Sequence, residues 1–250
     1  KRERKAFGSY GGGCHLAVGI NVKKVHDFYV HIHQGKSGDK EVSTLELEGF
    51  DYSELKGMKT YHVIGDKDFL INKNSIQSNQ AENENIFYTS SHCEHNLPAS
   101  ISSLWSAGNT SMKKLVKKGY WVNGSSEGFG HNVIADFKKS GVVSLMLGNK
   151  SWKVLSHEEA KSEVGEVIPC YSHKVKEGCE LPKAMRDAEI IHWSSHIQFK
   201  LYCATFPELK AKRHASGLGK TYHLINAELS QGQLQNLIPC IDHDHLLNQI

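Results

Sequence analysis

The hydrophobic pattern of the chain begins with alternating positions. Between residues 14 and 50, apolar residues alternate with polar ones, and the polar run GKSGDKE (35–41) separates two such segments. Alternation with a period of two is typical of half-buried β-strands, and a short Gly-containing break predicts a hairpin. The charged stretch at 1–10 predicts a short helix. Residues 1–57 are therefore expected to form a small α+β domain.

After this domain, short apolar runs alternate with helical segments, which is the signature of a parallel α/β sheet. The polar run at 71–85 has no apolar periodicity and predicts a linker or long loop. Strands are predicted at KTYHVIGD (59–66), NIFYTSS (85–91), SLWSAG (103–108), VVSLMLG (142–148), EVIPCYS (166–172), AEIIHWSS (188–195) and KRHASG (212–217). Helices are predicted at NTSMKKLVKKG (109–119), KTYHLINAEL (220–229) and QGQLQNLIPCID (231–242).

A weak internal repeat lies within this part of the chain. The segments IFYTSSH (86–92) and IIHWSSH (190–196) align, and each is followed by a strand that ends in Gly and then by a helix. Two α/β lobes of related design would produce this pattern, and chance similarity is the alternative for so short a match.

Hydroxyl residues and glycines follow the strands of both copies. In α/β folds, ligands bind at such strand ends, where backbone N–H groups and helix starts face the crevice. A multiply anionic ligand would suit that chemistry. The segment SGLGKT (216–221) is not a Walker A loop, because His214 stands where the motif requires glycine.

Composition narrows the class of protein. The chain has 250 residues, 39% of them hydrophobic and 23% charged, with a formal net charge of +3. We expect no nucleic-acid partner, since no basic stripe is present, and no membrane partner, since no apolar span or signal peptide is present. The six cysteines are scattered without a CxxC pair, which predicts free thiols and a cytoplasmic location. The chain begins at Lys1 rather than at methionine, which leaves open a longer parent protein.

The 16 histidines raise the question of a metal site. His31 and His33 would share one strand face, His243 and His245 lie close together near the end of the sequence, and HCEH (92–95) mixes candidate ligands. None of these groups has zinc-site spacing with a second half at the right distance. The prediction is therefore no metal, with the histidines at surfaces and caps.

Three glycines precede Cys14 in the segment YGGGC (10–14). Glycine runs occur where side chains would obstruct the backbone or its surroundings. One explanation is a helix end that turns into a strand, and the other is a bulky group beside Cys14.

The segment that carries Thr89-Ser90, Gly108-Asn109-Thr110, Gly119 and the small-residue loop NGSSEGFG (123–130) resembles uroporphyrinogen-III synthase. The resemblance continues through VVSLMLGNKSWKVL (142–155), Tyr171 in a crossover-like strand, AEIIHWSS and HASGLGKTYHL (214–224). These features lie between 86 and 240, and the resemblance extends over about 59–250.

The resemblance implies an α/β fold of two flavodoxin-like lobes with parallel sheets, joined by two crossover strands and preceded by the small α+β domain. Residues 58–72 and 174–250 would form the first lobe, and 73–173 the second. It also implies an activity in tetrapyrrole (haem) biosynthesis. A lyase of this kind closes hydroxymethylbilane into uroporphyrinogen III, inverting the last pyrrole ring, without cofactor or metal.

Site residues carried over by the resemblance fall into two groups. Tyr171 aligns with the family's tyrosine and would be the general acid. Substrate-binding roles are expected for Thr89, Ser90, Ser91, Asn109, Thr110, Ser125, Lys150, Ser194, Ser195, Gly217, Lys220 and Thr221.

The segment RERKAFGSYGGGCHLAVGI (2–20) resembles the start of the third domain of porphobilinogen deaminase. In that family the cysteine after two glycines carries a dipyrromethane cofactor. Cys14 would hold that cofactor only in a longer deaminase fusion, and the deaminase catalytic domains are then expected partners. This chain alone is not expected to catalyse the deaminase reaction.

Three functions stay open at this point. The first is the synthase, and the second is a non-catalytic tetrapyrrole-binding or docking remnant of a deaminase–synthase fusion. The third is an unrelated two-lobed α/β protein that binds a small anion. Fold alone does not separate them, because function depends on the site.

Overall fold

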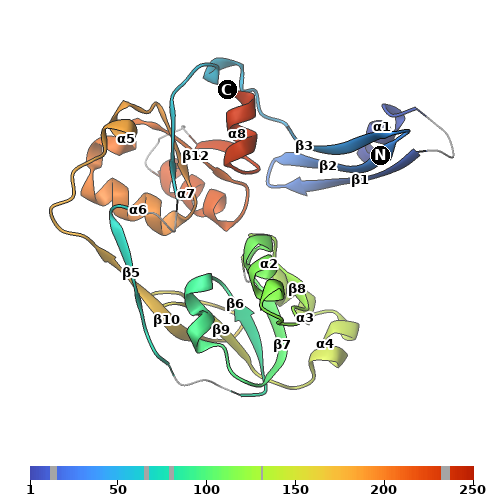
Figure 1. The fold of residues 1–250 in the computed structure, drawn as a ribbon, viewed down its shortest axis with the longest axis vertical. Coiled ribbons are helices and arrows are strands. Elements are labelled where there is room, and N and C mark those ends of the chain that lie inside the picture. The colour runs from blue at the N-terminus through green and yellow to red at the C-terminus, as the bar shows by residue number, and fades with distance from the viewer. Residues whose placement is uncertain (12–15, 65–67, 79–81, 131, 232–236) are drawn as a thin grey trace. The chain divides into compact units, whose positions relative to one another are not determined.

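The computed structural model describes residues 1–250 except 12–15, 65–67, 79–81, 131 and 232–236 (Figure 1). The chain forms two compact units: unit 1 comprises Lys1–Lys67 and Leu181–Ile250, and unit 2 comprises Asp68–Glu180. Unit 2 is thus an insertion in the sequence of unit 1. Each unit contains parallel strands and helices, so the predicted mixed α/β class is confirmed. The finer division into lobes stays a prediction.

Unit 1 begins with a three-stranded antiparallel sheet and a short helix, as predicted. Both connections between its strands are two-residue loops, and their first residues, His26 and Gly38, have φ angles of 52° and 61°. Positive φ at this point suits the right-handed twist of the strands that a two-residue loop joins. The elements are α1 (Arg2–Gly8), β1 (Leu16–Val25), β2 (Phe28–Ser37) and β3 (Lys40–Glu48).

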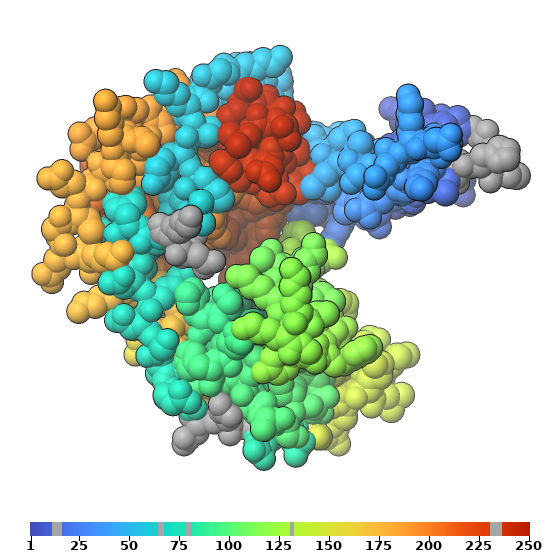
Figure 2. All heavy atoms as spheres, in the orientation of Figure 1, coloured from blue at the N-terminus to red at the C-terminus, as the bar shows by residue number. Residues whose placement is uncertain are grey.

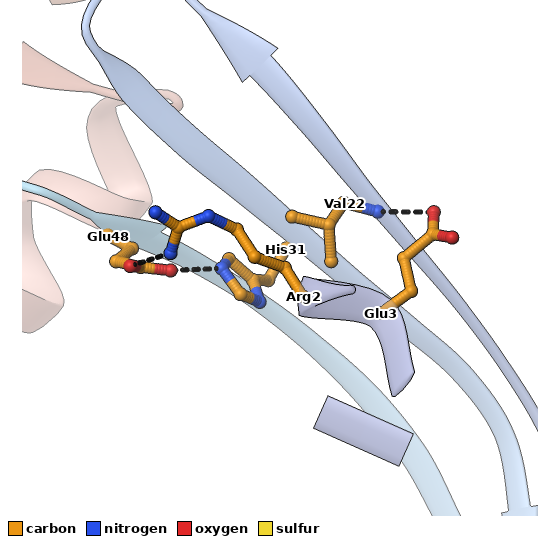
Figure 3. Close-up of polar contacts among 5 residues, drawn as sticks. All are labelled: Arg2, Glu3, Val22, His31 and Glu48. Atoms are coloured by element: carbon orange, nitrogen blue, oxygen red, sulfur yellow. Dashed lines mark hydrogen bonds and ion pairs between the residues drawn. The ribbon is translucent and has the colours of Figure 1, made fainter. Parts of the chain in front are cut away.

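Polar contacts at the first turn of α1 tie this helix to β1 and β3 (Figure 3). The Arg2 guanidinium pairs with the Glu48 carboxylate at the end of β3. The same carboxylate lies 2.8 Å from Nε2 of His31 on β2. Glu3 accepts a 3.1 Å hydrogen bond from the backbone N–H of Val22 on β1. Exposed ion pairs of this kind add little stability, so their main effect is to orient α1 on the sheet.

Gly35 occupies a position in β2 where a side chain has no room. Its φ is 141°, and a Cβ atom there would lie 1.8 Å from the carbonyl oxygen of Ala17 on β1. We expect Gly35→Ala to open the β1–β2 ladder, because the strands must separate to admit the methyl group. Amide hydrogen exchange of β1 measures this opening, and exchange should become faster along the strand.

Gly19→Ala is the matched control, because Gly19 lies on β1 in the same ladder. A Cβ atom at Gly19 would meet the Gln34 carbonyl oxygen at 3.7 Å, an ordinary van der Waals contact. This variant should exchange like the wild-type protein. Equal exchange in the two variants would contradict the steric argument.

The second part of unit 1 is a four-stranded parallel sheet in the order β13-β12-β11-β4. Three of its strands, β11, β12 and β13, are mostly buried because helices cover both faces of the sheet. Phe199 and Tyr202 of α6 pack around Trp193 on one face. The elements are η1 (Ser53–Leu55), β4 (Thr60–Val63), α5 (Lys183–Asp187), β11 (Ile190–Trp193), α6 (His196–Thr205), η3 (Pro207–Ala211), β12 (Arg213–Gly217), α7 (Lys220–Gln231), β13 (Leu237–Cys240) and α8 (His243–Gln249).

Helix α8 closes the other face of this sheet. Leu246 of α8 packs with Tyr52 and Leu55, which follow β3, and with Ile190 on β11. Figure 2 shows α8 (red) against the segment that follows β3. The Tyr52 hydroxyl donates a 2.6 Å hydrogen bond to the carbonyl of Pro239, which fixes the segment to β13.

The helix predicted over 231–242 is wrong for its second half. Leu237–Cys240 forms β13, a parallel partner of β12, and a separate helix starts only at His243. Pro239 lacks the N–H that a helix interior requires, and it is tolerated at the edge of a sheet. Residues 232–236 of the predicted helix lie outside the described part of the chain.

Unit 2 contains a six-stranded sheet in the order β5-β10-β9-β6-β7-β8. All neighbours pair in parallel except β5, which runs antiparallel to β10 (Figure 1). Its elements are β5 (Ile71–Ser75), β6 (Glu84–Tyr88), η2 (Ser91–Asn96), β7 (Ile101–Ser106), α2 (Asn109–Lys117), β8 (Gly124–Ser125), α3 (Asn132–Lys138), α4 (Gly141–Leu147), β9 (Trp152–His157) and β10 (Glu166–Val175).

Two predictions are corrected in unit 2. The segment 71–75, expected in a linker, is the edge strand β5; backbone pairing to β10 holds it, and Ile71 is its one fully buried residue. The segment 142–148, expected to be a strand, lies largely in helix α4. Its apolar side chains are divided, because Leu147 packs in the core with Phe87 and Trp152 while Leu145 is 86% exposed. The strand that pairs with β6 in the sheet is instead β9, which lies between β6 and β10.

The two copies of the internal repeat share an order of elements. β6 leads to a 3₁₀-helix, β7 and α2, while β11 leads to α6, β12 and α7. Ser90 and Ser195 each cap the helix after the first strand of their copy. No helix in the described parts of the chain combines the length and apolarity needed to cross a membrane.

Candidate functional site

Three neighbouring strands of unit 2 end at one edge of its sheet. β6, β7 and β8 pair in parallel, so the residues at their carboxyl ends lie along that edge. Asn109 and Thr110 open α2 there with exposed side chains. The structure thus brings six predicted binding residues to this edge: Thr89, Ser90, Ser91, Asn109, Thr110 and Ser125.

Several of these hydroxyls already have local structural partners. Thr89 Oγ1 donates a 2.8 Å hydrogen bond to the carbonyl of Leu155, which ties β6 to β9. Ser125 Oγ accepts a 3.0 Å bond from the N–H of Glu127. Their first role is therefore to shape the edge, as is usual for hydroxyls at strand ends and caps.

Lys150 is not part of this edge. It precedes β9, at the amino ends of the parallel strands, and its carbonyl accepts a 3.1 Å hydrogen bond from the Asn85 side chain. Parallel strands place their two ends on opposite edges of a sheet. The structure therefore separates Lys150 from the other candidate residues of unit 2.

Tyr171 lies on β10, where this strand pairs with the end of β9 at His157. Its side chain is 7% exposed, and Ser90 is the hydroxyl residue that acts on its phenol group. Burial raises the pKa of Tyr171 to about 12, against a smaller lowering by Ser90. The phenol therefore keeps its proton at neutral pH and can donate it to a ligand.

Basic side chains surround Tyr171. The rings of His173, His92 and His157 lie 5.2, 5.4 and 6.1 Å from the tyrosine ring. Lys73 Nζ on β5 lies 3.3 Å from His92 Nε2. Burial lowers the pKa of His173 to about 4, and the positive charges of its neighbours add to that effect. We call Lys73, His92, His157 and His173 the basic cluster.

Two buried thiols lie beneath this cluster. Cys93 on η2 and Cys170 on β10 belong to the same core as Tyr171 and interact with each other. That interaction lowers the pKa of Cys170 and raises the pKa of Cys93 above its usual range. The described cysteines are all free thiols, as predicted. Cys14, the candidate attachment point, lies outside the described residues.

The sheet of unit 1 has its own edge of predicted residues. Gly217 ends β12, and a Cβ atom there would lie 3.1 Å from the carbonyl oxygen of Ile241, so glycine permits this close approach. Ser194 Oγ donates a 2.8 Å hydrogen bond to the carbonyl of Val63. The structure places five predicted residues at the carboxyl ends of β11 and β12: Ser194, Ser195, Gly217, Lys220 and Thr221.

A histidine group lies at this edge as well. His62 on β4 and His192 on β11 are register partners with ring centroids 4.7 Å apart, and His243 of α8 stacks on His62 at 4.2 Å. Ser194 Oγ uses its proton toward Val63, so it accepts a 3.0 Å bond from Nε2 of His62. His62 is therefore the Nε2–H tautomer when neutral.

The stability of unit 1 should fall in acid because of His192, which is 5% exposed with neither ring nitrogen hydrogen-bonded. Burial, then the neighbours His62 and His243, lower its pKa to about 3 from the usual 6.5, while Asp242 and Asp244 act on those two neighbours. Between these values the unfolded chain binds the proton that the folded chain does not, so the free energy of unfolding decreases as pH falls from about 6.5 towards 3.

Urea unfolding at pH 7.5 and pH 4.5 measures this dependence. His192→Phe keeps a ring at the site without a titrating group, so its stability should depend less on pH than that of the wild-type protein. His95→Phe changes an exposed histidine and should leave the dependence unchanged. The same slope in wild type and His192→Phe would refute the assignment.

Sequence reasoning assigned the histidines to surfaces and caps, and it missed both groups. A usable signal was present only for the basic cluster, since His92, His157 and His173 each follow a serine at or near a strand end. Which of them converge depends on the pairing of β10 with β5 and β9, which the sequence did not reveal. Within the described part of the chain, no three His, Cys, Asp or Glu side chains are arranged to hold a metal ion.

The function of this protein has to be inferred from the residues at these two sheet edges. Each edge combines hydroxyl groups at strand ends with buried or half-buried histidines. A function must be argued from such a site rather than from the α/β fold, which hosts many activities. No protein-family model, curated protein or solved structure matches this chain.

Proposed function

We propose that this protein is a uroporphyrinogen-III synthase. It would close hydroxymethylbilane, a linear tetrapyrrole rimmed with carboxylates, into uroporphyrinogen III with the last ring inverted. The proposal includes the finer fold implied by the resemblance, with two flavodoxin-like lobes connected through β5 and β10 and a small N-terminal α+β domain. It also includes a cytoplasmic location.

One observation carries the proposal. A tyrosine that keeps its proton at neutral pH lies among basic side chains at the carboxyl edge of a parallel sheet. The first step of the reaction needs a proton donor beside an anionic substrate, and Tyr171 with the basic cluster has that combination. By itself, the edge of unit 1 carries hydroxyl donors suited to carboxylates.

Tyr171 would donate its proton to the terminal hydroxyl of the substrate. The carbon–oxygen bond then breaks, water leaves, and the methylene carbon attached to the pyrrole becomes electrophilic. Ser90 can donate its hydroxyl proton to the tyrosine oxygen, which stabilises the phenolate formed in this step. The phenolate regains a proton when the closed ring releases one, so the enzyme ends unchanged.

Ring inversion is a matter of orientation. The same electrophile closes without enzyme to the uninverted isomer, so the protein must favour attack by the substituted carbon of the last ring, through a spiro intermediate. Holding the reacting carbons in one geometry supplies that preference. Side chains available to hold the carboxylates are Thr89, Ser90, Ser91, Asn109, Thr110, Ser125, Ser194, Ser195, Lys220 and Thr221, with Gly217 leaving room for the backbone.

The test is a coupled assay on the full chain. A separate deaminase generates hydroxymethylbilane, this protein is added, and the uroporphyrin I and III isomers are separated after oxidation. The expected result is a shift to isomer III that grows with protein concentration. Isomer I alone at every concentration would reject catalysis.

Rejection of catalysis would favour the second candidate, a non-catalytic tetrapyrrole-binding or docking remnant of a deaminase fusion. The observation in its favour is the small domain of α1 with β1, β2 and β3, whose helix-then-strand order fits the segment resembling the deaminase. Its dipyrromethane on Cys14 would exist only in such a fusion, with the deaminase catalytic domains as partners.

A further inference from the structure

A groove of about 360 Å³ lies between helix α1 and strand β1 in the small antiparallel sheet of unit 1. Glu3, Arg4 and Phe7 line it from α1, and Val18 and Ile20 line it from β1. Val18 is 7% exposed, whereas Phe7 is 42% exposed. The groove therefore has a buried apolar floor and an apolar wall that remains open to a ligand.

Strand β1 is one edge of this sheet, since its only strand partner in the described part of the chain is β2. The backbone N–H of Val22 points away from β2, because it donates a 3.1 Å hydrogen bond to the Glu3 carboxylate (Figure 3). Along an antiparallel strand the backbone groups alternate between the partner and the outer edge, so those of Val18 and Ile20 also face outward. The two β1 residues that line the groove thus direct their backbone donors and acceptors to the outer edge.

The edge formed by β1 lacks the side chains that usually protect a sheet edge. Residues 16–22 contain neither a charged residue nor a proline. The opposite edge, β3, carries Lys40, Glu41, Glu46 and Glu48. Native proteins place charges, prolines or bulges on edge strands that must not pair with another chain. Strand addition is therefore favoured at β1 and disfavoured at β3.

The charge of α1 indicates which kind of strand fits this edge. Four of the first five residues of the chain are basic. Arg2 pairs with Glu48, whereas Arg4 has no acidic partner in the described part of the chain. A second copy of β1 would bring the same basic helix with it, and like charges disfavour that pairing. An acidic strand has the complementary charge.

We infer that this groove binds an extended acidic peptide of a partner protein, which adds to the sheet as a fourth strand beside β1. In this binding mode, main-chain hydrogen bonds to the edge give affinity and the groove accommodates alternate side chains. Apolar side chains of the peptide pack on Phe7 and Ile20, and an acidic one pairs with Arg4. The Glu3 carboxylate already occupies one acceptor position on the edge, where a carbonyl oxygen of the added strand would lie. This binding does not depend on the proposed synthase activity.

The test is fluorescence anisotropy of the full chain with a fluorescein-labelled Val-Glu-Val-Glu-Val-Glu-amide peptide. We expect saturable binding, and the corresponding Val-Lys peptide should bind at least about tenfold more weakly. Two further peptides carry N-methyl groups, one on the valine nitrogens and the other on the glutamate nitrogens. Only one of these two sets of N–H groups can face β1, so one methylated peptide should lose binding and the other should keep it.

Two substitutions in the groove have matched controls. Arg4→Glu should weaken binding by about tenfold or more, and Lys40→Glu, the same change of charge on β3, should stay within about twofold of wild type. Phe7→Ala should weaken binding by about fivefold. Leu45→Ala removes an apolar side chain of similar exposure, 41%, from β3 and should have little effect.

The outcomes decide between strand addition and its alternatives. Absence of saturable binding by the wild-type chain, equal affinity of the two methylated peptides, or wild-type affinity in both Arg4→Glu and Phe7→Ala would overturn the inference. A dimer in sedimentation velocity that these two substitutions dissociate, without any peptide binding, would overturn it in favour of a second copy of this chain. The methylated peptides leave the protein unchanged, so their result decides the question even where circular dichroism shows that a variant is misfolded.

Discussion

Replacement of Tyr171 by phenylalanine is expected to lower the rate of isomer-III formation by about 100-fold or more, the usual contribution of a positioned proton donor. The substitution removes the hydroxyl that donates the proton and leaves the ring in the core. The measurement is the rate of isomer-III formation in the coupled assay. Because the pKa of Tyr171 is about 12, the tyrosine should stay protonated between pH 6 and pH 9. The wild-type rate should therefore not fall in that range through deprotonation of this acid.

The matched control is Tyr88→Phe. Tyr88 is 2% exposed, belongs to the same core, and its pKa is likewise raised by burial. It lies on β6 and has no part in the proposed proton transfer. A near-wild-type rate for Tyr88→Phe and a large loss for Tyr171→Phe are expected. A Tyr171→Phe enzyme with the wild-type rate would exclude the tyrosine as the acid.

The second large effect concerns the stability of unit 2. Leu155 on β9 is 1% exposed and packs in the core that contains Tyr171, so Leu155→Ala should reduce the free energy of unfolding by about 2–5 kcal/mol. Lost burial and the cavity left behind both contribute. Urea unfolding followed by near-ultraviolet circular dichroism measures the loss, with separate transitions fitted if the units unfold separately.

Leu145→Ala is the control for residue type. Leu145 lies on α4 and is 86% exposed, so the same change of side chain removes almost no buried surface. Its effect should stay within about 0.5 kcal/mol. Similar losses at the two leucines would mean that Leu145 is itself packed in the core.

Elements whose signals lie within their own segment could be predicted from the sequence, and elements that depend on distant residues could not. The segment from β6 to α2 was predictable, because a buried run, Gly108 and a following helix are local signals. The α4 segment was not, since its apolar run belongs to a helix with largely exposed side chains. Strand β5 was missed because backbone pairing to β10, rather than its polar side chains, makes it a strand.

The candidate site was predictable to a similar degree. Serines and threonines at strand ends are visible in the sequence, and the structure gathers most of them at two edges. Lys150 was misplaced because the predicted strand at 142–148 put it after a strand rather than before β9. The basic cluster required the register that sets Lys73 opposite His173, and register is a long-range property.

The insertion of unit 2 in unit 1 couples the folding of the two. Lys59 and Glu189 are hydrogen-bonded although they are 130 positions apart in the sequence. Strand β4 therefore cannot pair with β11 until all of unit 2 has been synthesised. Once unit 2 folds, the pair Ile71 and Val175 brings the points where the chain enters and leaves it together. Closing a disordered loop of that length costs about 4 kcal/mol in chain entropy. Folded unit 2 therefore closes the loop between β4 and β11 of unit 1 in advance. A mutation that unfolds unit 2 should destabilise the parallel sheet of unit 1, because forming that sheet must then close the disordered loop.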